Sequence, residues 1–306
     1  MNRHYLHLAI SIFCLLLSCQ TAYSQDNIIS LRIMSYNIQH GAGMDDVIDL
    51  DRQAAVINAA MPDVVGLQEV DSCVKRSGYK PQAALLGSKT GMYATFGAAI
   101  PLTGGKYGIA ILSKEPPLTV HHLPLPGKEK RTLLVCEFQE YVFATTHLDL
   151  DEECRLNSLP IIMEEAASWG DKPFFICGDW NDQPSSTLIK NMKKAGLVFL
   201  NSLTSSNSSY TFPARSPNRI IDYIASYGRV HKSIKKRQVI NEPEASDHRP
   251  VLVEITLDSY TTAIDSHLEE SEEEVIYDLS GRMMPSGKLP RGLYIQKNRR
   301  HKLLVR

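Results

Sequence analysis

The sequence has little of what marks several protein classes. Lys and Arg total 33 against 34 Asp and Glu, a net charge of -1, so a strongly basic nucleic-acid-binding surface over the whole chain is excluded. Gly (18) and Pro (16) are modest and no heptad pattern persists, which excludes collagen, coiled-coil and low-complexity chains. No internal repeat is present, so a solenoid is excluded. The 306 residues, 43% hydrophobic and 22% charged, indicate a globular protein.

Long apolar runs are also missing. The run Leu8–Leu17 is much shorter than the roughly 20 residues that a membrane-spanning helix needs. With Arg3 before it and Ala22-Tyr23-Ser24 after it, the run is typical of a signal peptide covering residues 1–24. Leu16-Leu17-Ser18-Cys19 also resembles a bacterial lipobox, so lipidation at Cys19 stays open as a second route. Either route predicts export to the periplasm, the cell surface or the medium, with no transmembrane segment.

Four cysteines remain after this leader, and their spacing excludes a zinc site built on a Cys-x-x-Cys motif. Cys136 and Cys177 lie within apolar runs, which predicts two buried thiols. Cys73 and Cys154 fall in segments that we expect to be loops, where a disulfide is an open alternative.

The body of the chain, residues 27–258, alternates short β-branched runs with helical or loop segments, which predicts one mixed α/β layered domain. Asp49 or Asp51 is expected to cap a helix with Ala54, Ile57 and Met61 on one face. Two further helices are expected at 185–195 and 156–169, the latter with Pro160 near its start. The expected strands are Leu31–Ile38, Asp63–Val70, Tyr107–Leu112, Thr132–Phe138, Tyr141–His147, Phe174–Cys177, Ile220–Ala225 and Pro250–Leu257.

The composition changes after residue 258. Residues 259–274 are polar and acidic, which predicts a solvated linker. Residues 275–306 then contain short β-rich runs separated by turns, too few to bury a large core. This tail resembles the C-terminal sorting tails of exported Bacteroidetes proteins, which implies an export machinery as partner. A β-hairpin packed on the main domain is the alternative.

Polar clusters follow five of the expected strands. Together they offer Asp, Glu, Asn and His but no Cys or Ser nucleophile, a combination that favours a hard divalent cation and an activated water. The clusters are Ser35–His40, Leu67–Asp71, Thr145–Asp149, Gly178–Asn181 and Ser246–Pro250.

These motifs, in this order over Leu31–Leu257, resemble the endonuclease/exonuclease/phosphatase superfamily, also called DNase I-like. The resemblance implies a four-layered α/β sandwich of two packed mixed β-sheets flanked by helices, here followed by the small β tail. It also implies Mg²⁺ or Mn²⁺ as cofactor, held by Glu69 as main ligand together with Asn37 and Asp247.

The resemblance assigns the remaining site residues as well. Asp179 of Gly-Asp-Trp-Asn would align or deprotonate water, and His248, oriented by Asp222, would contact phosphate or act as the general base. Asn181 and His147 would donate to phosphate oxygens. His40, Arg76 and Tyr107 are expected to contact the substrate, with a solvated surface arginine as the alternative for Arg76.

The substrate follows less directly from the residues. The Pro-Ala-Trp-Cys-Asp-Arg block of inositol polyphosphate 5-phosphatases is missing. Residues 31–258 carry 24 Lys and Arg against 26 Asp and Glu, a net charge of -2. A small phosphodiester or a phospholipid head group is therefore favoured. A nuclease, for which the cluster Lys232–Arg237 would supply a basic face, is the alternative, and a catalytically silent binding module is the rival from another class.

Overall fold

The computed structural model describes residues 28–228 and 232–258, and beyond them four short strands between residues 276 and 305. The chain divides into two units, 1–259 and 260–306, and each is described by itself. The expected signal peptide at 1–24 and acidic linker at 259–274 lie outside the described residues. Among the described residues, no helix is both long and apolar enough to cross a membrane.

The first unit contains twelve strands, four α-helices and two short 3-10 turns in its described residues. The strands are β1 (Ile28–Asn37), β2 (Val64–Ser72), β3 (Tyr93–Leu102), β4 (Gly105–Ser113), β5 (Thr119–Leu125), β6 (Arg131–Glu137), β7 (Val142–His147), β8 (Phe174–Asp179), β9 (Val198–Phe199), β10 (Asp222–Tyr227), β11 (Lys232–Val239) and β12 (Val251–Asp258). The helices are α2 (Leu50–Ala60), α3 (Gln82–Thr90), α4 (Glu152–Ser168) and α5 (Thr187–Lys194), and the 3-10 turns are η1 (Gln39–Gly41) and η2 (Lys75–Ser77).

The strands form two six-stranded sheets, and both are mixed. The first sheet has the order β11-β12-β1-β2-β4-β3, and the second has β5-β6-β7-β8-β10-β9. Only the pairs β1–β2 and β7–β8 are parallel, each at the middle of its sheet. This is the predicted fold class, a sandwich of two mixed sheets with helices outside.

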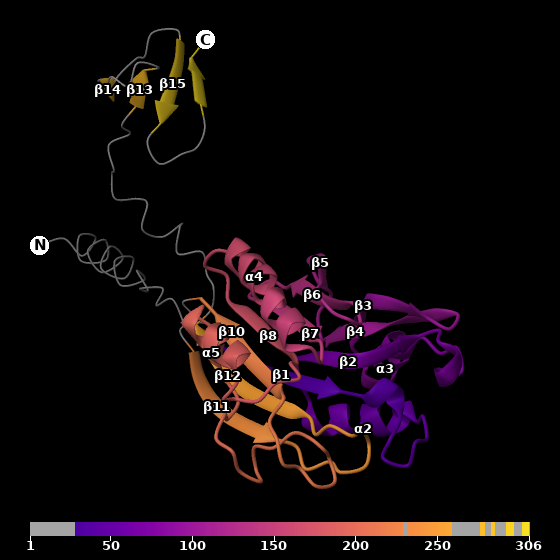
Figure 1. The fold of residues 1–306 in the computed structure, drawn as a ribbon. Helices are drawn as coiled ribbons and strands as arrows, with labels where there is room; N and C mark the ends of the chain where they lie inside the picture. Colours follow the sequence, from indigo (N-terminus) through magenta and orange to yellow (C-terminus); the bar gives the residue numbers. More distant parts are fainter. Residues whose placement is uncertain are drawn as a thin grey trace, which may run out of the picture. The chain divides into compact units, whose positions relative to one another are not determined.

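Three apolar clusters hold the layers together. One fills the space between the sheets, with side chains such as Ile33 of β1 and Phe143 of β7. A second packs α2 and α3 onto the outer face of the first sheet. The third packs α4 and α5 onto the outer face of the second sheet (Figure 1). The helices are therefore held mainly by burial of one apolar face, as is usual for helices of this length.

Two details of the expected helices are wrong. Asp49 caps α2 as predicted, its side chain accepting a hydrogen bond from the Asp51 N–H. Met61, however, is 61% exposed and ends the helix in a left-handed conformation, so it leaves the buried face formed by Ala54 and Ile57. Helix α4 begins at Glu152 because Asp151 caps it. Pro160 consequently lies inside the helix rather than near its start.

The cysteines follow the prediction in part. Cys136 and Cys177 are buried in the core between the sheets. Cys154 lies in the first turn of α4 rather than in a loop. Within the described ranges Cys73 and Cys154 are both free thiols, so the structure contains no disulfide between them.

The second unit contains a four-stranded antiparallel sheet in the order β14-β13-β15-β16. Its strands are β13 (Ile276–Asp278), β14 (Met283–Met284), β15 (Gly292–Gln296) and β16 (Lys302–Val305). The tail is thus β-rich, as expected, and its role in sorting stays a prediction.

Candidate active site

The two parallel strand pairs bring the predicted site residues together. In the first sheet Asn37 ends β1 beside Gln68 of β2. In the second sheet His147 ends β7 directly beside Asp179, the last residue of β8. Because parallel strands end at the same edge of a sheet, the polar residues after them accumulate there. The site lies where these two edges meet across the sandwich, since Asn37 of one sheet bonds to Asp179 of the other.

Glu69 owes its position to an irregularity in β2. The register between β2 and β4 shifts between Leu67 and Val70, and Glu69 has φ 57, a left-handed backbone. Such a bulge re-aims a side chain relative to regular alternation. The Gln68 side chain is bonded to the buried Thr145 hydroxyl at 2.9 Å, while Glu69 receives a hydrogen bond from Asn37 Nδ2 at 3.0 Å.

The environment of Glu69 keeps its carboxyl group ionised. Burial alone would raise its pKa, but the hydrogen bond from Asn37 and the nearby rings of His40, His147 and His248 outweigh burial and lower the pKa to about 2. Glu69 therefore carries a full negative charge at neutral pH, as a metal ligand must.

Asp179 is the centre of the site. Its Oδ2 accepts from Asn37 Nδ2 at 3.1 Å, and its Oδ1 accepts from the Asn181 backbone N–H at 2.9 Å. The Nε2 atoms of His147 and His248 both lie 3.5 Å from Oδ2. The side chain is 2% exposed, and this burial raises the pKa of Asp179. A carboxylate with a raised pKa is a stronger proton acceptor than an ordinary aspartate.

His248 lies between two carboxylates. Its Nδ1 is 3.0 Å and 3.2 Å from the two oxygens of Asp222, and its Nε2 faces Asp179. Burial opposes a charge on the ring, but Asp222 and Asp179 overcome this and raise the pKa of His248 to about 10. The ring of Phe212 covers it, with centroids 4.6 Å apart. The structure thus places Asp222 in contact with His248, and the orienting role that the family resemblance implies for Asp222 stays a prediction.

Ser246 links Asp247 to the first strand. Its Oγ lies 2.7 Å from the Asn37 carbonyl oxygen and 3.4 Å from Asp247 Oδ1. Burial raises the pKa of Asp247, and the negative charge of Glu69 adds to this effect while His248 opposes it. Glu69 and Asp247 therefore act on each other as like charges at one rim of the site.

Arg131, which the sequence did not single out, contacts the site from the start of β6. Its Nη1 lies 3.3 Å from His147 Nδ1 and 2.9 Å from Glu129 Oε1. Its side chain is 7% exposed, and its Nε, 3.6 Å from Asp149 Oδ2, has no hydrogen-bond partner. Burial and Arg131 together lower the pKa of His147 to about 3, so this ring is neutral at neutral pH.

One sequence signal could have identified Arg131. It is a charged residue at the start of the apolar run Thr132–Cys136, and β6 pairs antiparallel with β7. That pairing places Leu133 opposite Thr146, so the start of β6 lies beside the end of β7 and His147.

The three expected substrate residues lie at different places around this centre. His40, with φ 45, directs Nδ1 to within 4.0 Å of Glu69 Oε2. Arg76 binds both oxygens of the buried Asp71 at 2.9 Å and lies over the Tyr107 ring. Tyr107 is 8% exposed, and burial raises its pKa. Arg76 thus has a carboxylate partner already, and substrate contact by these residues stays a prediction.

Two groups of residues could hold a metal ion. Asp179, Asp222 and His248 offer ligand atoms within 4.8 Å of one another. In that group the His248 ring separates the carboxylates and bonds to Asp222, which leaves little freedom for an ion. Glu69 and the Asn37 amide bonded to it offer oxygen atoms, and the charge of Glu69 acts on the Asp247 carboxyl group. That donor set fits a hard cation such as Mg²⁺.

The fold and the site define a phosphoesterase of the DNase I-like class, and the comparison with known families agrees. The chain belongs to the Endonuclease/Exonuclease/phosphatase family, whose sequence pattern matches residues 34–248. That range spans the site from β1 to His248.

Solved structures share the fold at low sequence identity. An endonuclease/exonuclease/phosphatase from Beutenbergia cavernae DSM 12333 superposes with a TM-score of 0.60 at 22% identity, covering 74% of this chain and 72% of its own. The mannosyl-6-phosphatase Bt3783 of Bacteroides thetaiotaomicron VPI-5482 gives 0.60 at 19%, covering 74% and 99%. The human Nocturnin catalytic domain with bound sulfate anion gives 0.57 at 19%, covering 76% and 97%. No curated protein sequence matches the chain significantly.

Proposed function

We propose that the protein is a Mg²⁺- or Mn²⁺-dependent phosphodiesterase that hydrolyses its substrate with an activated water. The observation that carries this proposal is the convergence of Asn37, His147 and His248 on the buried carboxylate of Asp179, all within 3.5 Å. These groups come from β1, from β7 and from the loop before β12, so three separate parts of the fold meet at one carboxylate.

The chain's own groups supply most of the chemistry. Asp179, with its raised pKa, accepts the proton of an attacking water. His248 is protonated at neutral pH, is held at Nδ1 by Asp222, and donates from Nε2 to a phosphate oxygen. The neutral His147 ring and the Asn181 amide add uncharged polar contacts to the phosphate. Such preorganised groups stabilise charge that develops in the transition state.

We infer that a divalent cation would be held by Glu69 together with Asp247 and Asn37. When bound there, it supplies a Lewis acid for a phosphate oxygen and lowers the pKa of a bound water. The ionised Glu69, whose pKa is about 2, supports this assignment over the histidine-containing group.

The favoured substrate is a small phosphodiester or a phospholipid head group. The near-neutral charge of residues 31–258 supports this preference, since nucleic-acid binding draws on many phosphate contacts. The nuclease alternative is supported by the edge strand β11, where the exposed Lys235, Lys236 and Arg237 would supply a basic face. Similar structures include a mannosyl-6-phosphatase, so phosphomonoesters belong in any substrate panel.

Hydrolysis of bis-p-nitrophenyl phosphate tests the reaction class. The rate is expected to depend on Mg²⁺ or Mn²⁺ and to vanish with EDTA. Equal rates with and without EDTA contradict the metal requirement, and no hydrolysis with any divalent ion favours the silent binding module. A panel of single- and double-stranded DNA, RNA, phospholipids and phosphomonoesters then separates the substrates. Selective cleavage of DNA, weakening steeply with salt, identifies a nuclease.

We also propose that the protein is exported through its N-terminal leader, with residues 275–306 as a sorting signal. Cell fractionation combined with mass spectrometry of the mature N-terminus tests this. A chain beginning at Gln25 indicates signal-peptide cleavage, and a lipidated Cys19 indicates the lipoprotein route. A full-length chain in the cytoplasm would contradict both.

A further inference from the structure

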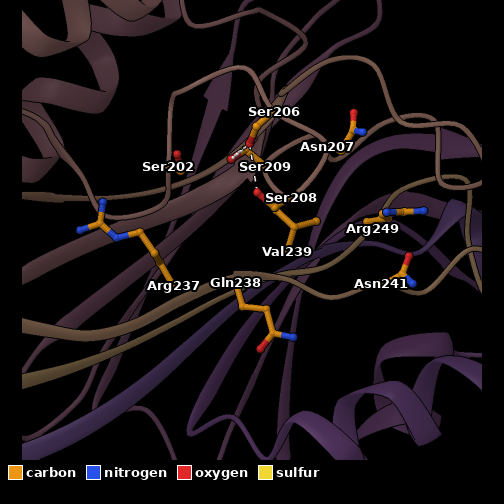
Figure 2. Close-up of a pocket in the computed structure, with 10 residues that line it drawn as sticks. All are labelled: Ser202, Ser206, Asn207, Ser208, Ser209, Arg237, Gln238, Val239, Asn241 and Arg249. Carbon is orange, nitrogen blue, oxygen red and sulfur yellow. Dashed lines mark hydrogen bonds between the residues drawn. The ribbon is translucent and has the colours of Figure 1, made fainter.

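A cavity outside the site described above lies between the loop that follows β9 and the second half of β11 (Figure 2). Its volume is about 510 Å³. One wall comes from the serine- and asparagine-rich segment 202–209, and the other includes Arg237 of β11 and Arg249, the residue after His248. The reaction chemistry described above uses none of these residues.

The cavity is positively charged. Among the described residues that line it, two are arginines and none is acidic, and the rest apart from Val239 carry hydroxyl or amide groups. Arg237 is exposed and forms no ion pair with another described residue. In Figure 2 the two arginines lie on opposite sides of the hydroxyl groups of Ser206, Ser208 and Ser209, and in this view both guanidinium groups extend away from the serines. This combination of donors suits an anion carried on a hydroxylated molecule.

Part of this lining is preorganised. Ser206 Oγ lies 3.0 Å from Ser208 Oγ and 2.9 Å from Ser209 Oγ, so the three hydroxyls form one cluster. Arg249 Nε donates to the Ala214 carbonyl oxygen at 2.7 Å, which fixes the guanidinium. A guanidinium group that is already held in place loses less conformational entropy on binding a ligand than a freely moving side chain does.

The same loop connects the cavity to the catalytic centre. After its serine cluster it continues through Thr211, whose carbonyl oxygen accepts from the Arg249 backbone N–H at 2.7 Å. The next residue, Phe212, packs on the ring of His248. The cavity and the catalytic histidine therefore share one short structural segment.

We propose that this cavity binds a second phosphate group of the substrate, one attached through a sugar or polyol whose hydroxyls meet the serines and asparagines. The proposal rests on the proposed function, because it assigns the second phosphate to the molecule whose first phosphate is hydrolysed. Phosphate is favoured because it presents three acceptor oxygens, which suits the exposed Arg237 guanidinium together with several hydroxyl donors.

A binding experiment tests the site without catalysis. The full chain in EDTA is titrated by calorimetry with thymidine 3′,5′-bisphosphate and with thymidine 5′-monophosphate. The wild type is expected to bind the bisphosphate about tenfold more tightly, the scale of one charge-assisted contact. Arg237→Gln is expected to remove most of this preference, whereas Lys190→Gln, which removes an exposed charge on α5, keeps it. Equal affinities in the wild type, or an unchanged preference in Arg237→Gln, overturn the proposal.

A kinetic comparison assigns the second phosphate to the substrate. Thymidine 5′-(p-nitrophenyl phosphate) is assayed with Mg²⁺, with and without a 3′-phosphate. The 3′-phosphate is expected to raise kcat/KM about tenfold in the wild type and in Lys190→Gln, and about twofold or less in Arg237→Gln. If the 3′-phosphate changes nothing while the plain ester is cleaved, the second-phosphate site is wrong and the phosphodiesterase stands. If neither ester is cleaved, the proposed function fails, and the titration alone still decides whether the cavity binds phosphate.

Discussion

Arg131 Nη1 lies 3.3 Å from His147 Nδ1, and the other ring nitrogen of His147, Nε2, also faces a hydrogen-bond donor. Asn181 Nδ2 is 3.0 Å from Nε2. A neutral imidazole accepts at only one of its two nitrogens, so Arg131 and Asn181 compete for that position. A guanidinium is always charged and can only donate, which makes it the stronger competitor. We therefore expect Nδ1 of His147 to accept and Nε2 to carry the proton, directed at Asp179 and the phosphate.

Replacing Arg131 by Met is expected to shift His147 to the opposite tautomer, with Nε2 accepting from Asn181. Nitrogen-15 NMR of the imidazole measures this directly. kcat should fall about 10- to 100-fold, the range found when a group that orients a functional imidazole is removed. Lys130→Met, which removes an exposed charge one residue away, is the control. A wild-type His147 protonated on Nδ1 would refute the assignment.

Replacing the central groups should be far more costly. His248→Ala and Asp179→Asn are each expected to lower kcat by about two to three orders of magnitude, the scale of acid–base and electrostatic groups. His122→Ala, an exposed histidine on β5, should leave kcat within about twofold and serves as control. A fully active His248→Ala enzyme would mean that the Asp222–His248 pair has no role in the reaction.

Glu69→Gln should act on metal binding rather than on the acid–base groups. It removes the carboxylate whose pKa of about 2 keeps it ionised, while the amide conserves the shape of the side chain. The Mg²⁺ concentration for half-maximal activity is expected to rise at least about tenfold, as for loss of a charged ligand. If only kcat at saturating Mg²⁺ fell, the ion would have to lie elsewhere, with Asp179, Asp222 and His248 as the remaining group.

The sequence predicted most of the site because its residues follow strand ends. Asn37, His147 and Asp179 each end a strand whose apolar run is evident, so their convergence follows from the sheet. Arg131 was missed because it begins a strand and reaches the site only through the β6–β7 pairing, which is a long-range contact. The left-handed backbone at Glu69 also depends on the β4 partner and has no local signal.

Parts of the fold could not be predicted for a similar reason. Edge strands β5 and β11 carry charged or imidazole side chains and little apolar alternation, so their pairing partners alone make them strands. Met61 fits the helical period of Ala54 and Ile57, but the chain must turn there to enter β2 and leaves it in solvent. Hydrophobic periodicity therefore predicted the central strands, whereas the edge strands depend on pairing in the folded structure.

In the metal-free protein, the two site histidines should make the free energy of unfolding change with pH in opposite directions below and above about pH 6.5. The pKa of His147 is about 3 in the folded state, so between 6.5 and 3 the unfolded chain binds the extra proton and stability falls as pH falls. The pKa of His248 is about 10, so the folded state holds its extra proton and stability falls as pH rises from 6.5 to 10. Urea unfolding across pH measures both. His147→Gln should make the free energy of unfolding depend less on pH below about pH 6.5, and Asp222→Asn should do the same above it. If the slopes against pH are unchanged in these variants, the assignments are contradicted.

Gly66 allows the two sheets to approach each other beneath the site. A Cβ at this position would lie 2.2 Å from Cys177 Sγ and 2.6 Å from Thr145 Oγ1, both in the opposing sheet. Gly66→Ala is therefore expected to lower the free energy of unfolding by about 1–3 kcal/mol through overpacking. Cys177→Ala removes the nearest atom, so the double variant Gly66→Ala/Cys177→Ala should be more stable than the sum of the single effects implies, with a coupling of about 0.5–3 kcal/mol. Denaturant unfolding of all four proteins completes the cycle, and strict additivity would show that the sheets do not meet at this contact.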